Sequence, residues 1–381
     1  MIRSGPARAM DGALALAAAM GIGRFAYTAL LPPTQRALQA GDGLAGLLAS
    51  LNLAGYLAGV LWARQLAASP RRAGALRAAL AATALSTAGG ALTTSALAWA
   101  ALRLVAGVAS GLAFVLVSAI AIEVASPSAG LLYGGVGLGV ALSGTAAAIL
   151  PERLGFGVPW LALGAAAALL AAPAWRRLAP IPPPHLHASP SPRDDAGVRF
   201  GRLAAAYFLE GLGYIVSGTF AVAAVRRTPG LEALAAWTWV LTGVAAAPSA
   251  VLWAAAGRRI GTKGALALAY FAQAAGMALP AVSRSPAAAL VGAGLFGATF
   301  VGIVTLAMLA GRALAPRSPG RIVGTLTALY GVGQVLGPLL AGAIAERLGD
   351  PRPAVLAAAV AVAMGGLLVA GGSPATPPPA R

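Results

Sequence analysis

The segment GALALAAAMGIGRFAYTALL, residues 12–31, contains a single charged side chain, Arg24. A helix of about 20 apolar residues is long enough to cross the ~30 Å hydrocarbon layer of a bilayer. An ionisable side chain at that depth costs roughly 2.5 to 3.5 kcal/mol even on insertion scales, so such residues usually line a solute pathway or pair with one another. Arg103 and Glu210 lie in similarly apolar segments. These three charges indicate a path for a solute through a membrane.

Eleven further apolar runs of spanning length follow this segment. We therefore expect an all-α integral membrane protein whose spans lie at about 12–31, 44–67, 73–94, 96–121, 129–150, 156–175, 203–225, 236–256, 264–282, 287–311, 322–345 and 354–372. The run from 73 to 122 is too long for one span, and Thr93-Thr94-Ser95 is its best turn. A signal peptide is a poor interpretation of the first run, because the run reaches full spanning length and others follow it.

The composition excludes several classes of protein. Charged residues make up 10% of the chain and hydrophobic residues 59%, whereas a soluble domain is about 25% charged. The net charge of +17 does not indicate a nucleic-acid partner, because the basic residues are scattered through short connections and form no single patch. Cysteine is absent and the only histidines are His185 and His187 in a Pro-rich connection. We expect no metal site, no cofactor and no enzyme activity.

The connections give the orientation and the domain boundaries. Most Lys and Arg residues outside the spans fall in connections on the side that holds both termini, which the positive-inside rule assigns to the cytoplasm. The long connection RRLAPIPPPHLHASPSPRDDAGVRFGR, residues 176–202, has the composition of a solvated linker. We expect a six-helix bundle at 1–178, a cytoplasmic linker at 179–202 and a second bundle at 203–381.

The two halves carry weak internal repeats, as a duplicated bundle would. Gly21-Ile22-Gly23 in the first span corresponds to Gly211-Leu212-Gly213 in the seventh, at an offset of 190. Further matches join spans 4 and 10, spans 5 and 11, and the connections after spans 2 and 8: Gly111 with Gly297, Gly135xxxGly139 with Gly333xxxGly337, and AGAL at 73–76 with KGAL at 263–266. The order of the matches follows the order of the helices.

Two six-helix halves joined by a basic central loop resemble the major facilitator superfamily. The segment GRRIGTKGAL at 257–266 is similar to the loop signature of that superfamily, and Arg103 with Gly107 and Gly111 resembles its helix-4 signature. More narrowly, the chain resembles uncharacterised bacterial transporters of the YbfB/YjiJ type in GIGRFAYTALLP at 21–32, SLNLAGYLAG at 50–59, EGLGYIVSGTF at 210–220 and GQVLGPLLAG at 333–342. The resemblance implies a multi-pass protein of the bacterial inner membrane, with both termini cytoplasmic, that works as a monomer. It implies no particular substrate.

Helices 1, 4, 7 and 10 line the central cavity in that superfamily, and the three intramembrane charges fall on the first three of these. Arg24 and Tyr27 share a helix face, and we expect Arg24 to bind an anionic group through its guanidinium fork. The alternative is an ion pair that holds the two halves together. For Arg103 the alternatives are substrate binding or a hydrogen bond to the backbone of helix 1, and its neighbours Gly107 and Gly111 then serve close helix packing.

Glu210 is the only acidic residue well inside a span, and burial favours the neutral form of a carboxyl group. We expect it to carry a proton; the alternative is a static salt bridge with Arg24 or Arg103. Tyr214 and Ser217 share its helix face. Tyr214 occupies the position equivalent to Arg24 in the other half, so the charges are asymmetric across the duplication.

Other polar residues lie at membrane depth. Gln334 is a candidate for the substrate pocket, because Gly331 and Gly333 leave space beside it. Asn52, Tyr56, Gln273 and Tyr330 are candidates either for the pocket or for interhelical hydrogen bonds. The Gly-rich segment YGGVGLGVALSG at 133–144 resembles an antiporter motif but lacks its Pro, so Gly135 and Gly139, like Gly333 and Gly337, are interpreted as sites of helix packing or rocking.

The resulting hypothesis is a secondary transporter that moves a small molecule, most simply an organic anion, by alternating access with proton coupling. Proton-coupled efflux of amphipathic compounds or drugs remains open, as does a membrane receptor or scaffold that transports nothing. A primary pump is excluded by the lack of a nucleotide-binding motif.

Overall fold

All regular elements in the part of the chain that the computed structural model describes, residues 5–66, 69–124, 129–150, 154–178, 198–314 and 319–371, are helices. The first half comprises α1 (Gly5–Leu16), η1 (Ala17–Ile22), α2 (Ala26–Leu38), α3 (Asp42–Leu66), α4 (Arg72–Gly89), η2 (Gly90–Leu92), α5 (Ala96–Val124), α6 (Ala129–Ile149) and α7 (Gly157–Arg177). The second half comprises α8 (Phe200–Arg226), α9 (Ala235–Ile260), α10 (Thr262–Val282), α11 (Pro286–Leu314), α12 (Pro319–Leu348) and α13 (Arg352–Ala370).

These elements form 12 segments that are long and apolar enough to cross a membrane, which confirms the predicted fold class. The turn expected at Thr93-Thr94-Ser95 is present, because η2 ends at Leu92 and α5 begins at Ala96. Most of the predicted linker, residues 179–197, lies outside the described residues, and α8 begins at Phe200. Large apolar side chains such as Leu97, Leu169 and Leu85 are 82%, 76% and 71% exposed. In a polytopic membrane protein such side chains face lipid.

The first span is not one regular helix. A π-helical segment, η1, follows α1, and a turn at residues 23–25 separates it from α2. Just after η1, the Gly23 amide donates to the Ala18 carbonyl at 2.9 Å and the Phe25 amide donates to the Met20 carbonyl at 3.3 Å. In both bonds the acceptor lies five residues before the donor. Gly21 lies against the backbone of Gly139 on α6 with no room for a side chain. The break therefore occurs where two glycines let another helix approach, and Arg24 stands on it.

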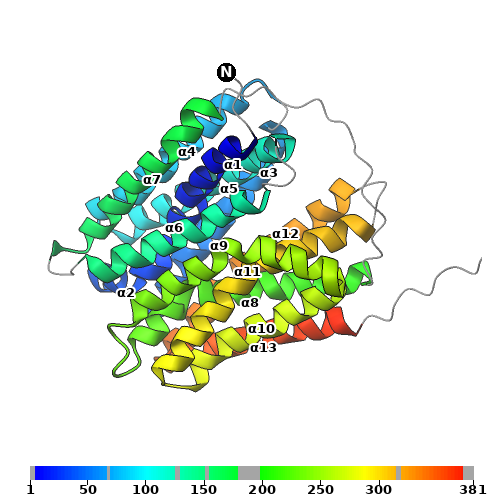
Figure 1. Ribbon diagram of the computed structural model, residues 1–381. Helices are drawn as coiled ribbons and strands as arrows, with labels where there is room; N and C mark the ends of the chain where they lie inside the picture. The colour runs from blue at the N-terminus through cyan, green and yellow to red at the C-terminus, as the bar shows by residue number, and fades with distance from the viewer. Residues whose placement is uncertain are drawn as a thin grey trace, which may run out of the picture.

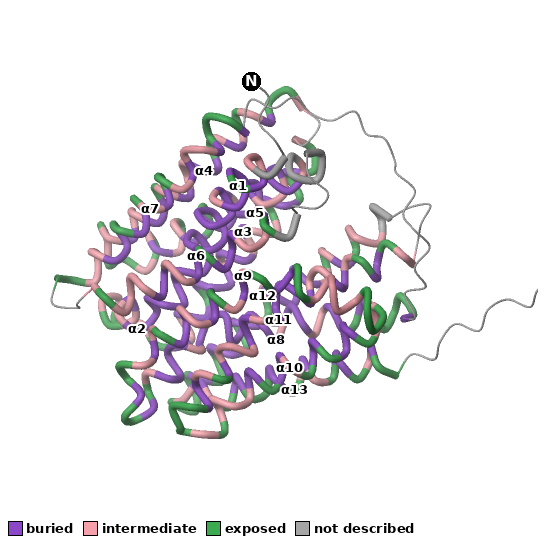
Figure 2. The backbone as a smooth tube through the Cα atoms, viewed as in Figure 1, coloured by how far each residue is buried: buried purple, intermediate pink, exposed green. Residues whose placement is uncertain are grey.

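The first and seventh spans form the centre of the molecule. Of an 18-residue apolar stretch within each span, 94% is buried in the first span and 78% in α8, but at most 56% in any other span of the described residues. Figure 2 shows the same pattern as nearly continuous purple along α1, α2 and α8. Arg24 and Glu210, which lie on these two spans, are therefore far from lipid.

The two halves meet through α3 against α12, α6 against α9 and α2 against α8. We call the end that holds the first described residues, 5–7, and the last, 369–371, the terminal end, and the end with the connections after α2, α8 and α12 the distal end. The halves lie close together at the distal end and diverge towards the terminal end (Figure 1). Because α1 lies at the terminal end, it packs within its own half, against α5, α6 and α7.

Candidate functional site

Arg24 is held between the two halves by groups that carry no formal negative charge. Its side chain is 4% exposed, and Nη2 donates a hydrogen bond of 2.8 Å to the hydroxyl of Tyr214 on α8. The guanidinium carbon lies 4.5 Å from the centre of the Tyr56 ring and 5.0 Å from that of Phe25. Cation–π contacts of this kind stabilise a desolvated cation but leave its charge uncompensated. No carboxylate pairs with Arg24 among the described residues.

Arg103 on α5 lies directly beside Arg24. Its Nη2 donates to the backbone carbonyl of Arg24 at 3.4 Å, which is the backbone hydrogen bond that one interpretation of the sequence required. Its guanidinium carbon lies 4.5 Å from the centre of the Tyr27 ring. The Asn52 amide nitrogen donates to the Arg103 carbonyl at 2.9 Å. Arg103 thus ties the break in the first span to α3 and α5.

On the side of the second half, Tyr214 and Gln334 complete the network. The Gln334 amide nitrogen donates to the same Tyr214 hydroxyl that accepts from Arg24. A continuous chain of polar contacts therefore runs from Asn52 through Arg103, Arg24 and Tyr214 to Gln334. We call these five residues the central network. All five are buried, at 5% exposure or less.

A row of aromatic rings extends from the central network. The Tyr214 ring stacks on Phe300 at 6.1 Å between centroids and on Tyr330 at 5.5 Å, and Tyr330 stacks on Tyr207 at 4.4 Å. Tyr207, Tyr330 and Tyr270 are the electrostatic neighbours of the Glu210 carboxyl group. The aromatic row, Phe300, Tyr214, Tyr330 and Tyr207, therefore connects the surroundings of Arg24 with those of Glu210.

Glu210 is fully buried, at 0% exposure, and pairs with neither arginine in the described part of the chain. Its Oε1 accepts a hydrogen bond of 2.7 Å from the Gln273 amide on α10. Thr299 on α11 in turn donates to the Gln273 carbonyl oxygen at 3.2 Å. The second carboxyl oxygen, Oε2, has no partner among the described residues. This arrangement differs from the static salt bridge that was the alternative for Glu210.

The structure brings together most of the residues singled out in the sequence. Arg24, Arg103, Asn52, Tyr214 and Gln334 form the central network, while Glu210 and Gln273 form a second cluster. Tyr27 is an exception: because the backbone turns at residues 23–25, its ring lies under Arg103, not beside the Arg24 guanidinium, and its hydroxyl donates to the Ala45 carbonyl at 3.2 Å. Tyr56 takes its place next to Arg24.

The predicted glycines lie at close contacts between helices. A side chain at Gly107 or Gly111 on α5 would overlap the carbonyl oxygens of Asn52 and Tyr56 on α3. The glycine pairs of the internal repeat make equivalent contacts, which pack α6 on the first span and α12 on α8: Gly135 and Gly139 meet the carbonyl oxygens of Ala13 and Ala17, and Gly333 and Gly337 meet those of Phe208 and Leu212. Close backbone approach of this kind is typical of small residues in membrane helices.

Several residues of the site were not anticipated. Tyr207, Thr299 and Phe300 have no pattern in the sequence that separates them from ordinary packing residues. Tyr207 lies three residues before Glu210 and so on the same helix face, which is the one signal that was present.

The distal end is closed by an ion pair between the halves that the sequence also did not reveal. Arg227, just after α8, donates from Nη1 and Nη2 to the two carboxylate oxygens of Asp42 on α3, both at 2.7 Å. This hydrogen bonding raises the pKa of the Arg227 guanidinium above its ordinary value. Gln35 also donates to Asp42, at 2.8 Å, and the Gly43 amide donates to Glu346 on α12 at 2.8 Å. Asp42 and Arg227 are called the distal clamp below.

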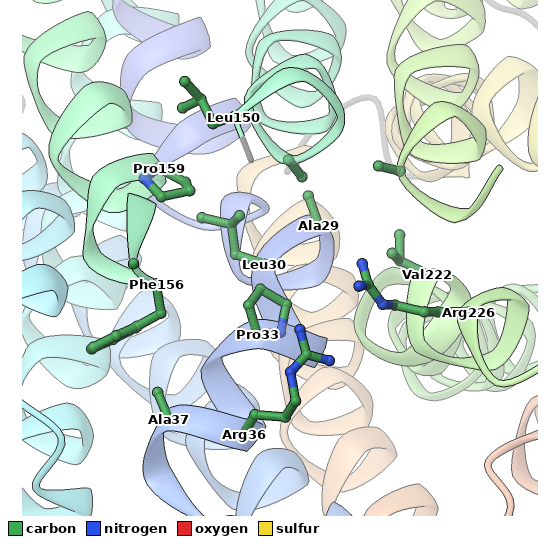
Figure 3. A pocket seen from close by; sticks show the side chains of 13 residues that line it. Ala29, Leu30, Pro33, Arg36, Ala37, Leu150, Phe156, Pro159, Val222 and Arg226 are labelled. Carbon is green, nitrogen blue, oxygen red and sulfur yellow. The ribbon is translucent and has the colours of Figure 1, made fainter. Parts of the chain in front are cut away.

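A pocket of about 320 Å³ lies beside the distal clamp, between the two halves. Its lining includes Leu30 and Pro33 from α2, Phe156 at the start of α7 and Val222 from α8, and the guanidinium groups of Arg36 and Arg226 lie at one side of it (Figure 3). None of the residues of the central network lines this pocket. The central network therefore does not open into this pocket.

Comparison with known proteins identifies the family. Residues 16–370 match the family described as "Uncharacterised MFS-type transporter YbfB". The chain belongs to this family of the major facilitator superfamily. It is therefore a multi-pass membrane transporter and not an enzyme, as the sequence predicted. No curated protein sequence matches the transporter.

Solved structures of other transporters share its fold. A bacterial homologue of the human lysosomal transporter Spinster, in an inward-facing and unoccupied conformation, is 16% identical with a TM-score of 0.68, covering 97% of this chain and 96% of its own. The nucleoside transporter NupG is 13% identical with a TM-score of 0.70, covering 96% and 98%. The human organic anion transporter MFSD10 is 19% identical with a TM-score of 0.63, covering 96% and 99%. At such identities the likeness establishes the fold alone.

Proposed function

We propose that the transporter moves a small organic anion across the bacterial inner membrane by alternating access, and that Glu210 couples this movement to a proton. The observation that carries the proposal is the pair Arg24 and Arg103. Arg24 is buried where the two halves meet, and Arg103 is buried next to it. No carboxylate neutralises either of them in the described part of the chain. A bound anion supplies the missing charge.

Energetics support an anionic substrate over a purely structural role. Leaving a buried charge without a counter-charge is costly, and cation–π contacts with Tyr56, Phe25 and Tyr27 offset only part of that cost. A carboxylate that binds a guanidinium fork forms two charge-assisted hydrogen bonds. Arg24 belongs to the first half and its hydrogen-bond partner Tyr214 to the second. An anion bound at Arg24 therefore affects the contact between the two halves.

Glu210 is suited to proton exchange because it is separate from the arginines. Only Gln273 donates to its carboxyl group among the described residues, and Oε2 has no partner there. A neutral carboxyl group is the favoured form in such surroundings, and an ionised one forms when the proton has a route to water. Protonation changes the charge near the central network by one unit, which links proton binding to anion binding.

The remaining parts of the proposal follow from the chain as a whole. The basic connections support a cytoplasmic position for both termini under the positive-inside rule. With that orientation, the divergence of the halves towards the terminal end corresponds to an inward-facing state. One of the solved structures with the same fold, the human organic anion transporter MFSD10, agrees with the proposed substrate class. We expect a monomer, two six-helix bundles at 1–178 and 203–381, and a linker at 179–202.

Proton-coupled efflux of an amphipathic compound is the second candidate. The aromatic row favours it, because stacked rings such as Tyr330 and Tyr207, 4.4 Å apart, suit flat apolar compounds. The two candidates differ in their need for Arg24. An anion requires the charge, whereas a neutral or cationic compound tolerates its loss.

The test uses the purified full-length protein in detergent. Thermal stabilisation is measured for wild type and Arg24→Met against a panel of small monocarboxylates and of neutral or cationic drugs, since a ligand stabilises the state it binds. Stabilisation by carboxylates that Arg24→Met abolishes supports anion transport; accumulation in proteoliposomes that requires an inward proton gradient supports coupling. Stabilisation by drugs that is equal in both proteins overturns the anion proposal in favour of efflux.

A further inference from the structure

The central network contains four buried polar atoms that have no hydrogen-bond partner among the described residues: Arg24 Nε, Arg103 Nε, Asn52 Oδ1 and Gln334 Oε1. Buried polar groups in native proteins are nearly always hydrogen-bonded, and each exception costs about 1 to 3 kcal/mol. All four atoms belong to residues of one hydrogen-bonded network, which makes this network the best candidate for a place where a ligand completes the hydrogen bonds.

The four atoms are of two chemical kinds. The two Nε atoms are donors on cations, whereas the two amide oxygens are acceptors. The roles are fixed by the remaining contacts: the amide nitrogen of Asn52 donates to the Arg103 backbone carbonyl, which leaves Oδ1 as an acceptor. The Gln334 nitrogen donates to the Tyr214 hydroxyl, which leaves Oε1. A simple carboxylate satisfies the donors and leaves both acceptors unpaired.

We infer that the substrate is a small hydroxycarboxylate, whose carboxylate accepts from Arg24 and Arg103 and whose hydroxyl donates to Asn52 or Gln334. This inference rests on the proposed function, which assigns an organic anion to this site. A hydroxyl group is a better match than an ammonium group, because an ammonium would lie next to two guanidinium cations. The chain supplies the acceptors from both halves, Asn52 from α3 and Gln334 from α12.

Recognition of the hydroxyl by one of these acceptors gives the site its selectivity. When an anion without a hydroxyl binds, Asn52 Oδ1 and Gln334 Oε1 remain buried and unpaired. Sites built to hydrogen-bond a hydroxyl reject analogues that lack it for this reason. When the acceptor is Gln334, the anion also links α12 to the arginines of the first half, beside the existing contact in which the Ser50 hydroxyl on α3 donates to the Val335 carbonyl on α12 at 2.8 Å.

The experiment compares matched pairs of ligands on the purified full-length protein: lactate with propionate, glycolate with acetate, and 3-hydroxybutyrate with butyrate. Dissociation constants are measured by thermal stabilisation and calorimetry for wild type, Asn52→Ser and Gln334→Met. Gln65→Met is the matched control, because Gln65 is exposed near the end of α3 and outside the central network. Size-exclusion profiles and the melting temperature without ligand show that each variant is folded.

We expect the hydroxylated member of a pair to bind wild type at least about tenfold more tightly, as one unpaired buried acceptor implies. The ratio falls towards one in Asn52→Ser or Gln334→Met and is unchanged in Gln65→Met. Equal binding of both members of each pair overturns the inference but leaves the proposed function intact, since water then completes the network. A ratio that neither variant changes also overturns it. If no carboxylate binds, the proposed anion function fails together with the inference.

Discussion

Arg24 and Tyr214 are joined by a hydrogen bond of 2.8 Å and lie 190 residues apart, which is the offset of the internal repeat. The two residues therefore occupy equivalent positions in the two halves. The next helical turn repeats the relationship, because the Thr28 hydroxyl donates to the carbonyl of Gly218, again 190 residues away. Equivalent positions touch only at the pseudo-twofold axis that relates the halves. The duplication thus placed a cation on one side of this axis and a phenol on the other.

Tyr214→Phe tests this contact. The substitution leaves the donors of Arg24 and Gln334 without their shared acceptor, so we expect a loss of stability of about 1 to 3 kcal/mol. The melting temperature of the purified protein measures it. Tyr133→Phe is the control, because in the described part of the chain the Tyr133 hydroxyl makes only a long contact of 3.5 Å with Ser118. Equal melting temperatures of Tyr214→Phe and wild type would show that the contact contributes nothing.

Glu210→Gln tests proton coupling. The amide mimics the protonated carboxyl group, so we expect the variant to bind and exchange the anion but to lose accumulation driven by a proton gradient. The measurement is uptake into proteoliposomes of the anion that stabilises wild type, with and without a pH gradient. Glu210→Asp, which keeps an acid, should recover part of the coupling. Gradient-driven accumulation by Glu210→Gln at the wild-type rate would remove Glu210 from the coupling mechanism.

Breaking the distal clamp should open the distal end. Partly exposed ion pairs contribute up to about 1 kcal/mol, so Arg227→Met should raise the population of distally open molecules by about fivefold. Val222 is 1% exposed and lines the pocket beside the distal clamp. Because the chain has no cysteine, the rate at which maleimide labels Val222→Cys measures opening of the distal end.

The exchange Asp42→Arg with Arg227→Asp should return the labelling rate towards that of wild type. Arg177→Met is the matched control, because Arg177 pairs with Asp11 within the first half and does not join the halves. A labelling rate that does not respond to Arg227→Met would mean that the clamp does not hold the distal end closed.

Gly107→Ala tests the contact between α3 and α5. The added methyl group would overlap the Asn52 carbonyl oxygen, and overpacking of this kind costs about 1 to 3 kcal/mol. Gly74→Ala is a matched change in α4 at a position with open space, and it should be neutral or stabilising by up to about 1 kcal/mol. Thermal unfolding of the two variants side by side decides the point; equal effects would contradict close packing at Gly107.

The ion pair of Asp350 with Arg352 predicts a specific pH dependence. The hydrogen bond from Arg352 lowers the pKa of the Asp350 carboxyl group below its ordinary 3.8. A lowered pKa in the folded protein means that the pair stabilises the fold above pH 3.8, and that this contribution disappears as the pH falls through the lowered value. The difference in melting temperature between wild type and Asp350→Asn should therefore be present at neutral pH and vanish in acid. A difference that does not change with pH would exclude the ionised pair as its cause.

The fold could be predicted from the sequence because the bilayer imposes simple rules. Apolar length gave the spans, and the turn at Thr93-Thr94-Ser95 was found because one apolar run exceeded the length of a single helix. Charge at membrane depth likewise singled out Arg24, Arg103 and Glu210, all of which are buried in the structure. What could not be predicted depends on how helices far apart in the sequence are rotated against each other.

Tyr27 illustrates that limit. Helical spacing places it on the face of Arg24, but the π-helical segment and the turn at residues 23–25 rotate the backbone between them, so that Tyr27 contacts Arg103. The distal clamp was hidden for a different reason. Asp42 begins α3 and Arg227 directly follows α8, and charges are common at such ends of membrane spans. Only the packing of α3 against α12 and of α2 against α8 brings the two residues together.

The aromatic row has a consequence for how the two charged sites can work in one cycle. If Glu210 formed an ion pair with Arg24, the two charges would compensate each other. The affinity of Glu210 for a proton and of Arg24 for an anion would then both be low. The rings of Tyr214, Tyr330 and Tyr207 instead separate the two groups while keeping both in a medium of low polarity. Electrical forces act across such a layer although ions cannot cross it. We therefore infer that the row keeps Arg24 and Glu210 from forming an ion pair, while a change of charge at either residue still alters the electrostatic energy of the other.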